Sequence, residues 1–599
     1  MTLWTDPGQP RIWRVGRLYF RGDEPMQCLE ACTDEALARI AANNYTGIWL
    51  RGRLRELVDS PIFPELNDPQ SSRRMDNLRH LVDRCAGHGL KLFVFFNEPL
   101  ALPDDHAFWQ NHAELRGEAW NHEMHDQPQV SLCTGTPEVM QWFRGNVKRF
   151  FDGLPGLGGA ILITASEYHT HCWSHHGRRP LSDGFVERAP EELGCPRCRE
   201  REPAEIVGDL VDTWAEAARA QDDPPRVIAW NWSWSMWYEE PQREVIDKLP
   251  DGVALLVDYE RGEPATRAGR EVLLDEYSLG LVGPSRRFAL SRDAARERGL
   301  EVFAKLQMGT THELATVPNL PLAEKLQRKL AGLAENEVSG IMGCWNFGCM
   351  STLNTFMHRR VVSHPNRAGQ PKFLVETARE YFGSVDTEAV LYGWRRFGEA
   401  FDEYPFSIPM LYWSPINYAP AYPLVSHYGG QAIGPSWIEH EWGEDPQKCL
   451  SPYTLDEVVE AFARVAEIWD DGLARYRKAL ADPSGADDEQ ALHRQRELDC
   501  AEAIGCHLES TALFFDFHRH RLEAMAQHNL QPPCDVPLSD EMVGMIHRQR
   551  DLAARVLELV ERDDRLGYHQ EPQHAFYTPE ILRESIERMQ QELDRVHNE

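Results

Sequence analysis

Polar and aromatic residues follow an apolar run near residue 165, and their types suit acid–base chemistry. Residues 160–164 (AILIT) have the composition of a strand buried on both faces, and the segment SEYH follows directly. In a parallel β/α protein, an acid at the carboxyl end of such a strand has the position of a catalytic group. Aromatic neighbours would raise the pKa of Glu167 toward that of a proton donor. The alternative is a buried strand whose exposed end merely carries a carboxylate.

Other expected strands also end in carboxylates, amides and indoles. The carboxyl ends of barrel strands lie at one rim, so these side chains are expected to face one site. Indole and phenol faces stack on sugar rings, and carboxylates and amides bind sugar hydroxyls. The expected substrate-binding residues are Asn97, Glu98, His169, Trp230, Asn231, Trp232, Trp234, Asp258, Glu260, His312 and Trp345.

Two carboxyl groups are expected to carry the reaction. Glycoside hydrolysis needs one carboxyl group that protonates the leaving oxygen and another that attacks or activates water. Glu167 follows the fourth expected strand and Glu313 the seventh, which would place them across the mouth of a barrel. We expect Glu167 to be the general acid/base and Glu313 to be the nucleophile or a group that binds sugar hydroxyls.

Several of these residues have a structural alternative. Glu98 could simply close its strand. Asp258 and Glu260 could pair with neighbouring arginines in a structural network. Trp232 and Trp234 alternate with polar residues, so they share a face that could equally belong to the core.

Cysteines and histidines follow the acid. Cys172 precedes a C-x-x-C segment made by Cys195 and Cys198, and His176 lies nearby. Three thiols and one imidazole can bind structural zinc tetrahedrally. We expect Cys172, Cys195, Cys198 and His176 to hold zinc as a staple for a long loop, and we expect no cofactor for catalysis. Reduced cysteines without a ligand are the alternative.

Apolar runs alternate with amphipathic stretches up to about residue 365. The expected strands are residues 12–19, 46–50, 90–96, 160–164, 226–230, 253–257, 302–307 and 339–345. Eight such β/α units predict a (β/α)8 TIM barrel over residues 1–365. Doubly wound sheets seldom reach eight units, and no Gly-rich nucleotide loop follows the first strand.

The sequence changes character beyond the barrel. Residues 366–450 are rich in Pro, Tyr, Trp and Gly and predict an irregular segment near the barrel mouth. Residues 451–599 contain four segments of helical period, which predict an α-helical bundle as C-terminal domain. Residues 566–577 are too aromatic for an ordinary surface loop and are expected to contact something. The bundle could cover the chain's own site or that of a neighbour in a homo-oligomer.

Charge and composition exclude several classes of partner. Lys and Arg number 63 against 94 Asp and Glu, and the net charge of −31 argues against nucleic acid and anionic membrane surfaces. The sequence has no apolar run of the length that spans a membrane, and its N-terminus lacks the features of a secretory signal. The 13 scattered cysteines do not form a disulfide framework. We expect a cytoplasmic protein that acts on a small carbohydrate, more plausibly neutral than polyanionic.

Five segments carry a resemblance to a known family. They are residues 95–103 (FFNEPLALP), 131–139 (SLCTGTPEV), 163–172 (ITASEYHTHC), 195–198 (CPRC) and 312–321 (HELATVPNLP). Together they resemble bacterial TIM-barrel glycoside hydrolases distantly related to the family 20 β-N-acetylhexosaminidases. The resemblance covers most of residues 10–360.

The resemblance assigns roles to two positions. It implies that Glu167 is the general acid. In family 20 an Asp precedes this Glu and orients the 2-acetamido group of the substrate, which acts as nucleophile, whereas this chain has Ser166 there. The difference favours a protein nucleophile, with Glu313 in that role. Retaining barrels with a Glu after strands four and seven have a similar layout, although they normally place Asn before the first Glu.

Three classes of function therefore remain. The first is an exo-acting, hexosaminidase-like β-glycosidase, with substrate-assisted hydrolysis as its variant. The second is a catalytically silent barrel that binds carbohydrate. The third is a metal-dependent lyase or isomerase that uses His169, His171, Glu167 and Asp258 as ligands.

Overall fold

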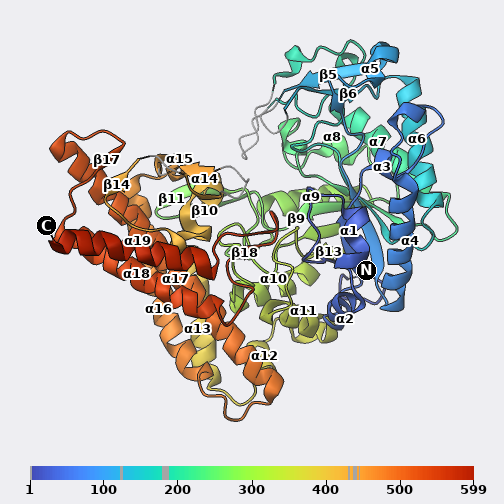
Figure 1. Cartoon of the computed structure of the whole chain (residues 1–599). Helices are drawn as coiled ribbons and strands as arrows, with labels where there is room; N and C mark the ends of the chain where they lie inside the picture. The colour runs from blue at the N-terminus through green and yellow to red at the C-terminus, as the bar shows by residue number, and fades with distance from the viewer. Residues whose placement is uncertain are drawn as a thin grey trace. The chain divides into compact units, whose positions relative to one another are not determined.

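Eight parallel strands close into a barrel in the computed structural model of the chain (Figure 1). The structure describes residues 3–121, 126–178, 188–429 and 445–598, together with the backbone of 432–435 and 441–443. The barrel strands are β1 (Arg11–Arg14), β2 (Gly47–Arg51), β3 (Lys91–Phe96), β7 (Gly159–Ile163), β8 (Arg226–Trp230), β9 (Ala254–Asp258), β12 (Glu301–Lys305) and β13 (Gly340–Met342). The ladder closes because β1 pairs with both β2 and β13. The predicted (β/α)8 barrel is confirmed.

Small residues make room for aromatic rings inside this sheet. A Cβ atom at Gly47 would lie 2.6 Å from the ring of Phe93, and one at Gly340 would lie 2.7 Å from the ring of Phe303. The strands are almost entirely buried, as their β-branched and aromatic composition predicts. The first strand is shorter than expected, since it ends at Arg14 and a turn at Gly16 and Arg17 follows.

Helices follow the strands around the barrel. They include α1 (Glu24–Ala31), α2 (Asp34–Ala42), α4 (Ser71–Gly87), α6 (Pro137–Asp152), α7 (Pro203–Arg219), α8 (Arg243–Ile246), α9 (Arg286–Glu297) and α10 (Ala323–Glu335). Helix α6 has Thr136 as N-cap and Pro137 in its first turn, and it buries Phe143 and Phe150 on one face. A three-stranded sheet, in the order β4-β6-β5, is inserted after β3. Its strands are β4 (Leu102–Pro103), β5 (Arg116–Trp120) and β6 (Gln129–Leu132).

The chain divides into two compact units. The barrel unit contains Met1–Arg261, Pro284–Leu306 and Leu333–Gly343, and so holds every barrel strand. The helical unit contains Gly262–Gly283, Gln307–Gly332 and Cys344–Glu599. Segments that follow β9, β12 and β13 thus belong to the helical unit. The domain limits expected at residues 365 and 450 remain a prediction.

The helical unit confirms the helical C-terminal region. Its long helices are α11 (Leu353–Ser363), α12 (Lys372–Phe382), α13 (Thr387–Asp402), α16 (Leu455–Leu480), α17 (Asp488–His528), α18 (Asp540–Val560) and α19 (Pro579–Asn598). The expectation that residues 366–450 are irregular throughout is wrong for α12 and α13. Helix α13 is capped by Asp386 and buries Trp394 and Phe397 on one face, so its amphipathic pattern outweighs the aromatic composition.

Two other features of the helical unit contact the segment that carries the predicted His312 and Glu313. Helix α14 (Ile408–Trp413) carries Tyr412, and the hairpin of β18 (Tyr568–His569) and β19 (His574–Ala575) lies in the aromatic loop. That hairpin contacts the segment after β12, because the Gly567 amide donates to the Thr316 carbonyl over 2.9 Å. Among the described helices, none has the length and apolarity needed to cross a lipid bilayer.

The barrel closure gives a stability prediction. Gly159 on β7 pairs with Arg226 on β8, and a Cβ atom at Gly159 would collide with the Arg226 carbonyl oxygen. Because a ladder carbonyl cannot move away, Gly159→Ala should lower the free energy of unfolding by about 1–3 kcal/mol in urea titrations. Gly87→Ala at the end of α4 is the control, since nothing lies within 4 Å of its added Cβ. Equal stability of the two variants would contradict this view of the closure.

Candidate active site

Glu167 lies in the turn that directly follows β7. Its side chain is partly exposed, whereas Ser166 before it is buried. Burial of the carboxyl group raises the pKa of Glu167 above its usual value, and the Arg51 guanidinium and the Ser166 hydroxyl act in the opposite direction. Tyr168 is also partly exposed, and its amide donates to the Ser166 hydroxyl over 3.2 Å. The turn therefore presents one carboxyl group with a raised pKa at the end of the strand.

Two buried amide side chains lie at the neighbouring strand ends. Asn97 follows β3 and donates from Nδ2 to the Ser166 hydroxyl over 3.2 Å. Asn231 follows β8, the other neighbour of β7 in the barrel. Among the described residues, neither Asn97 Oδ1 nor Asn231 Nδ2 has a hydrogen-bond partner. A buried amide atom without a partner costs free energy, so both positions suit hydroxyl groups of a ligand.

Glu98 has the geometry of a loop anchor. Its carboxylate accepts from the Leu54 amide over 2.6 Å and from the Leu100 amide over 3.0 Å. Burial raises the pKa of Glu98, and the two amides oppose that shift. The carboxylate thus ties together the segments that follow β2 and β3, which is the structural alternative for this residue.

The ends of β8 and β9 carry an indole with a guanidinium over its face. The Arg261 guanidinium lies 3.9 Å from the ring centroid of Trp232 and 3.8 Å from Asp258 Oδ2. Trp232 is partly exposed, whereas Trp230 and Trp234 are buried. The Trp234 indole donates to the Thr164 hydroxyl over 2.9 Å, which is a role in the wall of the barrel. Glu260 is fully buried.

Four buried thiols gather where the loop after β7 meets the inserted sheet, and one of them was not expected. The sulfur atoms of Cys133, Cys172, Cys195 and Cys198 all lie within 4.8 Å of one another. The structure brings Cys133 to the position for which the sequence suggested His176. His176 instead has Nε2 3.8 Å from Glu118 Oε1. Cys133 directly follows β6, so the inserted sheet carries it to the loop after β7, a proximity that spacing alone does not show.

The other histidines of this loop are part of its packing. His169 has Nε2 2.8 Å from the Glu118 carbonyl and Nδ1 3.1 Å from the Ser174 hydroxyl, so both ring nitrogens are engaged. The Trp173 amide donates to His171 Nδ1, and burial lowers the pKa of His171 to about 3. Within the described part of the chain, the four thiols are the one group that could hold a metal ion. The ligands expected for a metal-dependent lyase or isomerase do not form such a group among the described residues. These ligands are His169, His171, Glu167 and Asp258.

Glu313 belongs to the helical unit, in the segment after β12. The hydroxyls of Ser278 and Thr311 both donate to its carboxylate, and the Tyr404 hydroxyl donates to its carbonyl over 3.2 Å. Burial raises the pKa of Glu313, while the two hydroxyls and Lys329 oppose the shift. This is a buried carboxyl group that is held in one orientation.

The helical unit contains a second buried acid that the sequence did not predict. Glu276 is buried, and its Oε2 accepts from the Tyr412 hydroxyl over 2.9 Å. His312, an expected substrate-binding residue, has Nδ1 3.7 Å from Glu276 Oε1 and Nε2 3.3 Å from the Tyr412 hydroxyl. The ring of Phe347 meets that of His312 edge-on, with centroids 5.0 Å apart. Glu276 follows the hairpin of β10 (Glu263–Arg267) and β11 (Arg270–Leu274), well beyond the strand end that the sequence pointed to.

The segment after β13 carries the last expected residues. Trp345 is partly exposed, and its amide donates to the Gln307 side chain over 2.9 Å. The neighbouring Asn346 is buried, and neither its Oδ1 nor its Nδ2 has a hydrogen-bond partner among the described residues. Asn97 and Asn231 each have one such atom, whereas both polar atoms of the Asn346 side chain lack a partner in the described chain.

The barrel, its polar strand ends and the helical region that follows define the class of fold, a TIM barrel with a helical C-terminal region. No protein-family profile and no curated protein matches the sequence. One solved structure with this architecture is that of a GH138 enzyme targeting pectin rhamnogalacturonan II. It shares 10% identity and has a TM-score of 0.52, covering 100% of this chain and 85% of that chain.

Two further solved structures are less similar in their coordinates. An O-GlcNAc hydrolase mutant from Thermobaculum terrenum shares 10% identity with a TM-score of 0.39, covering 98% of this chain and 94% of that chain. GH5_18 from Streptomyces cattleya, in complex with GlcNAc, shares 13% identity with a TM-score of 0.34, covering 61% of this chain and 81% of that chain. Families 138 and 5 are named among these three structures, and family 20 is not. At such identities the likeness to the first structure establishes the fold.

Proposed function

We propose that the chain is a glycoside hydrolase that removes a terminal sugar, with Glu167 as general acid/base. The observation that carries the proposal is a carboxyl group of raised pKa at the end of β7, with Asn97 and Asn231 at the ends of the two neighbouring strands. Each of these buried amides lacks a protein partner on one atom. Sugar hydroxyls would satisfy those atoms. The fold shared with a GH138 enzyme agrees with this reaction class, although fold alone is an analogy.

The environment of Glu167 suits a proton donor. Burial favours the neutral carboxylic acid, which can protonate the glycosidic oxygen as the bond breaks. After the sugar has left, the same carboxylate can accept a proton from the attacking water. Asn97 orients Ser166, and the Ser166 hydroxyl also accepts from the Tyr168 amide, so the turn that carries the acid is held on both sides.

Glu313 is our candidate for the second carboxyl group. Burial raises the pKa of Glu313, but two hydroxyl donors act against this shift and favour the ionised form that a nucleophile requires. The same donors fix the carboxylate for binding sugar hydroxyls. Ser166 stands where substrate-assisted enzymes of family 20 have Asp, which favours a nucleophile from the protein. A substrate-assisted β-N-acetylhexosaminidase and a silent carbohydrate-binding barrel remain the alternatives.

If Glu167 is the general acid/base, replacing it should lower the rate of hydrolysis and remove one limb of the dependence of kcat/KM on pH. On a panel of aryl glycosides, Glu167→Gln should lower kcat about 10²–10⁴-fold. Because the acid must be protonated, kcat/KM of the wild type should fall as the pH rises through the raised pKa of Glu167, and the variant should lack this limb.

The control is Glu192→Gln, an exposed residue of the same long loop. Equal activity of wild type and Glu167→Gln would refute the assignment. Binding of sugars without turnover by the wild type, measured by calorimetry, would favour the silent barrel.

The role of Glu313 is tested by chemical rescue. If Glu313 is the nucleophile, Glu313→Ala should lose turnover on an activated glycoside and regain it with azide, which fills the space and forms a glycosyl azide. Product analysis by mass spectrometry detects that compound. Retained turnover without glycosyl azide would leave Glu313 as a residue that binds hydroxyls.

We also propose that the four thiols bind a structural zinc ion. Tetrahedral zinc–thiolate bonds of about 2.3 Å place sulfur atoms about 3.8 Å apart. The separations of Cys133 Sγ from Cys195 Sγ and Cys198 Sγ, 3.5 and 3.6 Å, are close to this value. Hydrogen bonds from surrounding residues hold the thiols in place. Glu118 accepts from the Cys195 amide, and Arg197 donates to Cys133 Sγ. Reduced thiols agree with the expected cytoplasmic location, which remains a prediction.

The zinc proposal predicts a metal content that follows the thiols. Protein purified without added metal should contain about one zinc ion per chain by mass spectrometry. Cys133→Ser should lose it and melt at a lower temperature, whereas Cys85→Ser, a buried thiol outside the cluster, should keep it. His176→Ala should also keep the zinc. Full zinc in Cys133→Ser, or none in the wild type, would overturn the proposal.

A further inference from the structure

We propose that the sugar bound beside Glu167 carries a carboxylate, as a hexuronic acid does, and that Arg51 binds this group. The inference rests on the proposed function and names the substrate class of the same site. It starts from Arg51, the last residue of β2, whose guanidinium has no role in the reaction described so far.

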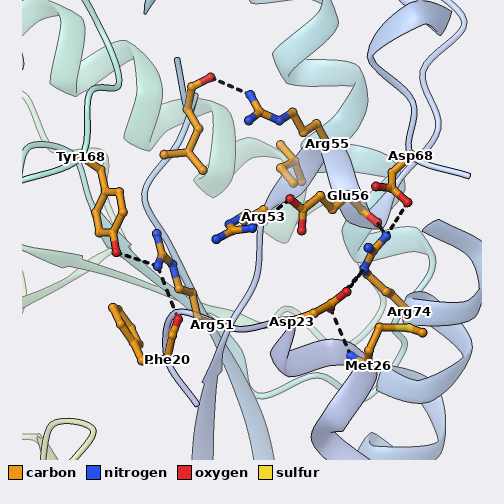
Figure 2. Close-up of polar contacts among 12 residues, drawn as sticks. Phe20, Asp23, Met26, Arg51, Arg53, Arg55, Glu56, Asp68, Arg74 and Tyr168 are labelled. Carbon is orange, nitrogen blue, oxygen red and sulfur yellow. Dashed lines mark hydrogen bonds and ion pairs between the residues drawn. The ribbon is translucent and has the colours of Figure 1, made fainter. Parts of the chain in front are cut away.

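The Arg51 guanidinium lies between two aromatic rings at the carboxyl end of the barrel (Figure 2). Its Cζ is 4.7 Å from the ring centroid of Phe20 and 4.1 Å from that of Tyr168. Nη1 donates to the Tyr168 hydroxyl over 2.9 Å and more weakly to the Phe20 carbonyl over 3.5 Å. Tyr168 directly follows Glu167, so the guanidinium belongs to the surroundings of the proposed acid.

This guanidinium is buried without a carboxylate partner. Arg51 is only 4% exposed, and its Nε and Nη2 have no hydrogen-bond partner among the described residues. No carboxylate oxygen of the described chain forms an ion pair with it. Two other buried arginines of the barrel unit form ion pairs, Arg14 with Glu24 over 2.6 Å and Arg74 with Asp68 over 2.7 Å. A third, Arg11, has no ion pair, but its guanidinium donates to three backbone carbonyl groups. Figure 2 shows the ion pair of Arg74 near the site of Arg51.

The acid that accepts from the backbone at the end of β2 is already occupied. Glu24 accepts the Arg51 backbone amide over 2.8 Å, but both of its oxygens are held by the Arg14 guanidinium. Burying a cation without an opposite charge is costly. Neutral hydroxyls offset this cost only in part, whereas a carboxylate matches the planar fork of a guanidinium with two parallel hydrogen bonds.

The charges around Glu167 also favour an anionic group on the ligand. Arg51 and the exposed Arg21 both lower the pKa of Glu167, so both cations act on the proposed acid. Arg17 is a further exposed cation in the turn after β1. A local group of arginines in a chain of net charge −31 would attract one anionic group to this part of the rim. This refines the expectation of a neutral substrate to a sugar with a single acidic group.

Access to Arg51 depends on Tyr168. The unpartnered nitrogens are closed off from solvent, and the partly exposed ring of Tyr168 covers one face of the guanidinium. A bound carboxylate would therefore displace this ring or take the place of its hydroxyl as the acceptor from Arg51.

The test compares aryl glycosides that differ only at C6. Each pair contains a uronide and its parent hexoside, in the gluco, galacto and manno series. The wild type should prefer the uronide of its series at least about tenfold in kcat/KM, the scale of one charge-assisted hydrogen bond. Arg51→Gln should bring the ratio near one, and Arg51→Lys, which keeps the charge but loses the fork, should give an intermediate ratio. Arg53→Gln is the control, because Arg53 lies on the same loop but pairs with Glu56 over 3.1 Å.

Some outcomes would overturn the proposal. These are a wild type that prefers neutral hexosides, an unchanged ratio in Arg51→Gln, or a preference for 6-phosphorylated or 6-sulfated sugars over uronides. Circular dichroism shows whether each variant folds, and Arg51→Lys carries the comparison where Arg51→Gln does not.

Failure of the proposed function has a separate signature. If the wild type hydrolyses no aryl glycoside, calorimetry with free glucuronate, galacturonate and mannuronate still tests the binding site. Binding that is at least about tenfold tighter than for the parent hexoses, and that is lost in Arg51→Gln, would support the site without the reaction. Absence of binding by all three acids would overturn it.

Discussion

Closure of the eight-stranded sheet is the constraint on which the rest of the barrel unit depends. Every barrel strand has a neighbour on both sides, so no strand can shift its register without breaking two ladders. Ring-over-glycine contacts, such as Phe93 over Gly47, leave little space for repacking. Parallel direction then brings Asn97, Glu167, Asn231 and Asp258 to one end of the barrel. The positions of the polar groups follow from the packing of apolar ones.

The second constraint is the cost of burying polar groups at that end. Most of them are compensated within the barrel unit: Arg14 by Glu24, and Glu98 by two backbone amides. The amides of Asn97 and Asn231 and the guanidinium of Arg51 lie at the same end, and each has buried atoms that lack hydrogen-bond partners in the described chain. A ligand bound at this end would supply the partners that these atoms lack.

The sequence predicts the parts that depend on local pattern. Buried strands of β-branched and aromatic residues, with helices between them, predict the barrel, and the acid at the end of the fourth strand follows from its position. Cys133 and Glu276 could not be found in this way. An inserted sheet brings Cys133 to the other thiols, and a hairpin separates Glu276 from its strand end. His176 is close in sequence to Cys172, yet the geometry of the loop turns it toward Glu118. Each miss arises from contacts between residues distant in sequence.

The loop after β7 explains why an acid and a thiol cluster occur together. Between β7 and α7 its described parts contain two 3-10 helices of three residues each and one isolated β-bridge, so no strand ladder or long helix holds the segment that carries Glu167. Drawing Cys172, Cys195 and Cys198 together with Cys133 on the inserted sheet restricts the loop to few conformations. A general acid is effective only when its carboxyl group is held close to the productive position. Cys172, the first of the loop thiols, lies shortly after Glu167 in the sequence. The thiol cluster therefore restricts this loop in the way that the hydrogen-bonded ladders restrict the barrel strands.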